Sequence, residues 1–78
     1  MINAFSHYTN TQIKEMVDDW IHSARDREIL IYRLIDGMTI EQIVTRYQDE
    51  HPDRAVSADT IKRALRKGEA QLIRHVQI

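Results

Sequence analysis

The chain has 78 residues, 42% of them hydrophobic and 29% charged, and a formal net charge of −1; these values are ordinary for one small globular domain, which buries only ~60–65% of its unfolded surface. It contains no cysteine, which excludes a disulfide framework, a thiolate metal site and a cysteine nucleophile. The first ten residues have neither the basic start nor the apolar core of a signal peptide, and no apolar run is long enough to cross a membrane, so we expect a cytoplasmic protein.

A first helix is predicted over residues 10–22, after a segment, residues 1–8, that has no periodicity and is expected to be flexible. Its apolar residues recur at i, i+3, i+4, i+7 and i+8, the spacing of a core-facing stripe: Ile13, Met16, Val17, Trp20 and Ile21. We expect Trp20 at the centre of the core, because a buried indole ring removes a large apolar area from water. A ligand-stacking role for Trp20 is the alternative.

A second helix is predicted over residues 24–36. Ser23 is a favourable N-cap residue, and Asp26 follows three positions later. The run from Ile29 to Ile35 is apolar on nearly all sides, which is typical of a helix with neighbours on more than one side. Gly37 is placed to end the helix in the left-handed conformation.

A third helix is predicted over residues 40–50. Thr39 and Gln42 have the spacing of a capping box. Pro52 prevents the helix from continuing, so a loop follows, and Val56 is expected to pack into the core at its end.

A fourth helix is predicted over residues 57–76, with Ser57 as N-cap and Asp59 in the first turn. Its apolar stripe begins with Ile61, Ala64 and Leu65 and continues through Gly68, Leu72 and Val76, which favours one long helix. The alternative is an end at Gly68, which follows Arg66 and Lys67 as a C-terminal glycine would. The sequence therefore predicts a single all-α domain over residues 1–78, an array of four helices without strands.

Charge divides the chain into two parts. Residues 1–53 carry a net charge of −5, and residues 54–78 carry +4. On the predicted fourth helix, Lys62, Arg63 and Arg66 fall on the side opposite the apolar stripe. This asymmetry favours a polyanion as the partner of the second part, although a solvated basic surface is the simpler interpretation of the helix alone.

Several segments resemble region four of bacterial sigma factors, in order and in spacing, and most of all the small sigma-like proteins of phages and mobile elements. They are Asp26–Leu30, Arg33–Thr39, Glu41–Ile43, Ser57 and Thr60–Arg63. The resemblance implies a helix-turn-helix fold whose last helix, residues 57–76, enters the major groove of a promoter element, and a contact with RNA polymerase. By position it implies a DNA-binding set of Ser57, Asp59, Thr60, Lys62, Arg63, Arg66 and Lys67, with the last two near phosphates.

The chain departs from that family between its last two helices. A helix-turn-helix usually has a turn of about four residues there, whereas Gln48–Ala55 intervenes here. The angle between the third and fourth helices is therefore left open. No segment could melt a promoter, so the chain is not a complete sigma factor.

The function expected from the sequence is sequence-specific DNA binding in transcription regulation. The alternative is a protein-interaction module that binds RNA polymerase or a sigma factor without reading DNA, which the acidic faces of the first and third helices favour. A homodimer is expected through apolar residues near the chain end that no later element can cover, namely Leu72, Ile73, Val76 and Ile78. No enzymatic activity, cofactor or metal site is expected, because His22 and His51 lack metal-ligand spacing and are expected to be solvated.

Overall fold

Four helices make up the protein in a computed structural model, which describes residues 8–76 and, for Val76, the backbone alone. They are α1 (Asn10–Trp20), α2 (Ala24–Leu34), α3 (Ile40–Glu50) and α4 (Ala58–Val76). Residues 8–76 contain no strand. The prediction of an all-α fold with four helices is confirmed, and the predicted ends of α1 and α2 lie two residues too far along the chain.

The predicted capping residues begin the helices. Thr39 and Gln42 form the predicted capping box of α3. Thr9 and Gln12 form the same motif at α1, where no cap was predicted. The Ser23 hydroxyl accepts a hydrogen bond from the backbone N–H of Asp26 at the start of α2. These bonds satisfy N–H groups that have no partner within the helix.

Gly37 closes the connection between α2 and α3. Its φ of 67° is the left-handed conformation expected from the sequence. The N–H of Met38 donates to the Tyr32 carbonyl at 3.0 Å, and the Arg33 guanidinium donates to the Met38 carbonyl at 2.9 Å. The chain therefore turns within a few residues, and α3 starts close to the end of α2.

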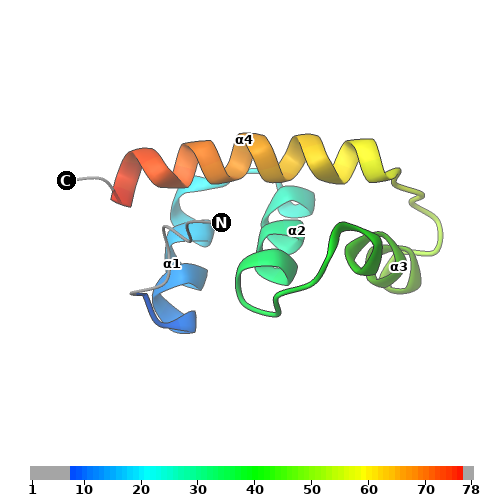
Figure 1. Ribbon diagram of the computed structural model, residues 1–78, viewed down its shortest axis with the longest axis horizontal. Coiled ribbons are helices and arrows are strands. Elements are labelled where there is room, and N and C mark those ends of the chain that lie inside the picture. Colours follow the sequence, from blue (N-terminus) through cyan, green and yellow to red (C-terminus); the bar gives the residue numbers. More distant parts are fainter. Residues whose placement is uncertain (1–7, 77–78) are drawn as a thin grey trace.

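α4 runs along one side of the molecule and packs on all three other helices (Figure 1). α2 lies between α1 and α3 and contacts all of its neighbours, whereas α1 and α3 do not contact each other within the described residues. This arrangement explains the apolar run of α2, because Ile29 and Leu30 are fully buried and Ile31 and Leu34 pack against the core from its flanks.

Trp20 does not lie at the centre of the core, so this prediction was wrong. The side chain is 41% exposed, and its ring stacks on His75 of α4 with centroids 3.6 Å apart and planes 13° apart. The core positions of α1 are Ile13 and Val17, continued by Ile21, each one helical turn after the last. Trp20 is displaced from that line and covers the outer edge of the contact between α1 and α4.

Gly68 lies inside α4, which continues through it to Val76, so one long helix is confirmed. A side chain at this position would collide with α2: an ideal Cβ would lie 2.5 Å from Leu30 Cδ1. The glycine therefore allows α2 and α4 to approach closely, and it does not end the helix. No helix within residues 8–76 has both the length and the apolar character needed to span a bilayer.

Candidate nucleic-acid interface

The residues predicted to face DNA lie together on the N-terminal half of α4 and at its cap. All are exposed except Thr60, which is half-buried. The opposite side of the helix is in the core, where Ile61 is fully buried and Ala64 and Leu65 are nearly so. At about 100° per residue, Arg63 and Arg66 point most directly away from the core, and Lys62 and Lys67 flank them on either side.

Two of the predicted DNA-facing residues are engaged in the start of α4. The Ser57 hydroxyl accepts the backbone N–H of Thr60 at 3.2 Å, and the two hydroxyl groups lie 3.1 Å apart in a further hydrogen bond. Ser57 is therefore the N-cap, as predicted from the sequence. The hydroxyls of Ser57 and Thr60 both lie at the start of the helix, but they already form hydrogen bonds within the protein.

The cations of α4 differ from the arginines of α2 in what they contact. The Arg27 guanidinium donates to the carbonyls of Ile21 and His22 at 2.9 and 3.0 Å, and Arg33 holds the turn after α2. No cation of α4 forms an ion pair or a side-chain hydrogen bond within the described residues. Arg27 and Arg33 thus hold the fold, whereas the cations of α4 are free to meet an anion.

A groove between α2 and α4 extends this basic surface. It has a volume of about 310 Å³ and is lined by Arg25 and Asp26 of α2 and by Thr60, Arg63, Ala64 and Lys67 of α4. Arg25 is bonded to Asp26 at 3.3 Å, and its side chain is 47% exposed. The sequence prediction missed Arg25, because its approach to Arg63 and Lys67 depends on the crossing of α2 and α4. In the sequence, only the position of Arg25 in the first turn of α2 could have indicated that it lies near α4.

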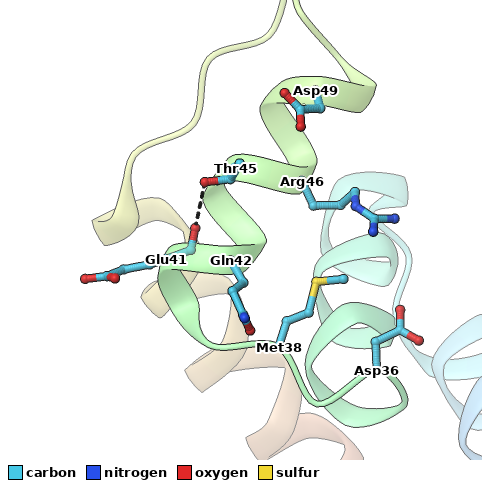
Figure 2. A pocket seen from close by; sticks show the side chains of 7 residues that line it. All are labelled: Asp36, Met38, Glu41, Gln42, Thr45, Arg46 and Asp49. Carbon is cyan, nitrogen blue, oxygen red and sulfur yellow. Dashed lines mark hydrogen bonds between the residues drawn. The ribbon is translucent and has the colours of Figure 1, made fainter.

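A second groove, of different character, lies on the far side of α3 at the turn after α2 (Figure 2). Its volume is about 580 Å³, and three acidic residues, Asp36, Glu41 and Asp49, line it together with Arg46 and Met38. In Figure 2, Arg46 extends from α3 toward α2, where its guanidinium carbon lies 6.0 Å from the centre of the Tyr32 ring. The acids outnumber the cation, so this surface suits a basic or neutral partner and would repel a phosphate backbone.

The long connection between α3 and α4 is attached to α2. His51 caps the end of α3, and its Nε2 lies 2.9 Å from each carboxylate oxygen of Glu28. Glu28 also accepts the Tyr32 hydroxyl at 2.9 Å. Partial burial and this carboxylate raise the pKa of Tyr32 to about 12. The expectation of a solvated His51 was wrong, since the ring is partly buried and bonded to another helix.

The predicted dimer surface is only partly accessible. Leu72 is fully buried within the single chain, so it cannot add contact area to a dimer, and this part of the prediction was wrong. Ile73 is half-buried and packs against the core. The side chain of Val76, and Ile78 as a whole, lie outside the described residues.

No protein-family model, curated protein or solved structure matches the chain.

Proposed function

We propose that this chain is a sequence-specific DNA-binding regulator of transcription that acts in the cytoplasm in the manner of sigma factor region four. The observation that carries the proposal is the solvent-facing side of α4. Five cations are exposed there, and none of them has an acidic partner within the described residues: Lys62, Arg63, Arg66, Lys67 and Arg74. Such a surface attracts phosphates, and a helix of this kind fits the major groove of B-DNA.

The position of each cation supports a different role. Arg63 is directed away from the core near the N-terminal half of α4, where a guanidinium can pair with O6 and N7 of a guanine. Lys67 lines the groove between α2 and α4 together with Arg25, and this position suits a phosphate of the backbone. Lys62 and Arg66 would then lie on the other side of Arg63 from Lys67, toward the opposite edge of the major groove.

The proposal is tested by selecting preferred duplexes from a random pool and measuring their affinity across a salt series. Arg63→Ala should weaken binding to the preferred site by ~1–3 kcal/mol and relax the preference at one base position. Lys67→Ala should weaken all sequences alike and reduce the salt slope by about one.

Lys14→Ala is the matched control, because Lys14 is an exposed cation of α1 that forms no ion pair within the described residues. It removes the same charge without touching α4, so specific affinity should change little. A wild-type affinity no better than nonspecific at moderate salt would contradict the proposal. So would equal effects of the Lys14, Arg63 and Lys67 substitutions.

The second candidate function is a module that binds RNA polymerase or a sigma factor without reading DNA. The acidic groove on α3 supports it, because three acidic residues line it, which suits a basic segment of another protein. Charge reversal by Glu41→Lys would then abolish polymerase or sigma binding, while the Arg63 and Lys67 substitutions would leave it intact. If the DNA proposal is right, the Arg63 and Lys67 substitutions should weaken DNA binding, and Glu41→Lys should not.

We also propose a homodimer through the end of α4, with Ile73, Val76 and Ile78 as its contacts. The exposed edge of Trp20, next to the last turns of α4, adds apolar surface to this region. Sedimentation equilibrium of the full chain is the direct test. A monomer at the highest soluble concentration would exclude the dimer and leave the DNA proposal unaffected.

A further inference from the structure

The connection between α3 and α4 is longer than the usual turn of a helix-turn-helix. Contacts to the rest of the protein are therefore needed to keep it in one conformation. Residues 51–57 are not helical, and they lead the chain into the first turn of α4. Packing on the other three helices already limits the angle of α4, so a constraint on this loop acts mainly on the N-terminal turns of α4. The described structure places several contacts at one residue of this loop, His51.

His51 makes contacts through its backbone, its ring and its Nε2 atom. Its backbone N–H donates to the Tyr47 carbonyl and closes the last turn of α3, and its carbonyl accepts the N–H of Arg54. Its ring packs on the Tyr47 ring with centroids 4.5 Å apart, and Nε2 points to both oxygens of Glu28 on α2. Because a carboxylate only accepts hydrogen bonds, Nε2 carries the proton and donates it.

Glu28 is itself held in place. It lies on the central helix α2, and its Oε2 accepts the Tyr32 hydroxyl from one helical turn further along. The Tyr32 ring is in turn approached by Arg46 of α3. The carboxylate is therefore a fixed acceptor on the rigid part of the fold, and the loop is the part that attaches to it.

From this geometry we infer that the bond between His51 and Glu28 is a latch that positions α4 and thereby determines which bases its N-terminal half can read. The effect on base preference rests on the proposed DNA-binding function. The bond between His51 and Glu28 and its effect on the position of α4 do not. His51 and Glu28 are positioning residues, since neither lies on the exposed face of α4.

The bond joins a side chain of the loop to a carboxylate on α2. Removing either partner detaches the His51 ring from α2. The orientation of α4 should therefore be held more tightly in wild type than in a variant that lacks this bond.

The first test needs no DNA. Amide hydrogen exchange of residues 54–61 is compared, after correction for intrinsic rates, in wild type, His51→Gln and Glu28→Gln. Both variants should show weaker protection of this segment than wild type. His22→Gln is the matched control, because the His22 ring is exposed and forms no hydrogen bond within the described residues. Protection of this segment in both variants equal to that in wild type would overturn the latch.

The second test uses the preferred duplex from the random pool. His51→Gln should lower specific affinity on the order of tenfold and leave nonspecific affinity unchanged. The double variant with Glu28→Gln should be no worse than the single one, because both remove the same bond. Equal losses of specific and nonspecific affinity, or additive losses, would overturn the positioning role. Absence of any preferred duplex would refute the proposed function instead, and hydrogen exchange would still decide the latch.

Discussion

Gly68→Ala should have two opposing effects on stability, because Gly68 lies inside α4 and also contacts α2. Alanine favours the helix, but its methyl group collides with the neighbouring helix. An ideal Cβ would lie 2.5, 3.0 and 3.1 Å from the Cδ1, Cδ2 and Cγ atoms of Leu30. Leu30 is fully buried, so its side chain cannot turn away into solvent. The new methyl group must therefore move either the leucine or the two helices.

The magnitude follows from the two effects. Alanine in place of glycine within a helix stabilises by ~1 kcal/mol. An extra carbon in a well-packed core costs ~1–3 kcal/mol. We expect a net loss of ~1–2 kcal/mol at Gly68, since the 2.5 Å approach is far below van der Waals distance. For a domain of this size, each 1 kcal/mol lowers the melting temperature by ~4–8 °C.

Urea and thermal unfolding of four variants separate the effects. Leu30→Ala alone should cost ~2–5 kcal/mol, because it leaves a cavity. In that background Gly68→Ala should stabilise by ~1 kcal/mol or more, since the methyl group then fills space, so its sign reverses. Ala70→Gly, at an exposed position of α4, measures the helix effect alone and should cost ~1 kcal/mol. A Gly68→Ala variant that is more stable than wild type would refute the close approach of α2 and α4.

Trp20→Ala should cost only ~1–2 kcal/mol, as the loss of an edge contact and a ring stack, whereas Ile43→Ala at a fully buried position should cost ~2–5 kcal/mol by urea unfolding. Tyrosinate absorbance should show Tyr32 ionising near pH 12. Because its pKa is raised on folding, its stabilising contribution is complete below about pH 10 and declines toward pH 12, and Glu28→Gln should move the ionisation toward the ordinary value. Thr39→Ala removes the capping box of α3 and should cost ~1 kcal/mol in thermal unfolding.

The helices were predictable because their signals are local. A cap such as Thr39 and an apolar stripe such as that of α1 depend only on residues within a few positions of each other. The apolar run of α2 also indicated correctly that this helix has neighbours on several sides. The apolar stripe of α4 correctly predicted which side of this helix lies in the core. The polar residues on its other side therefore lie together, as predicted for the DNA-facing set.

What the sequence could not supply depends on how the helices cross. Trp20 belongs to the apolar stripe of α1 by spacing, but the packing of α1 on α4 leaves it 41% exposed and stacked on His75. Leu72 is near the chain end, yet α4 folds back over α1 and α2 far enough to bury it. Arg25 and His51 acquired their partners in the same way, from helices distant in sequence. No local pattern encodes these contacts.

A charge count alone cannot distinguish a cation that holds the fold from one that is free to bind, and the distinction decides how this chain's charge asymmetry is interpreted. Arg27 and Arg33 donate to carbonyls at the ends of helices, where an unpaired backbone group would be costly if buried. Their N–H donors are thus already engaged within the fold. The cations of α4 have no such partners within the described residues, and Arg63 and Arg66 point away from the core. The excess of +4 after residue 53 is therefore largely available to an outside anion, and this availability, more than the net charge, favours DNA as the partner of α4.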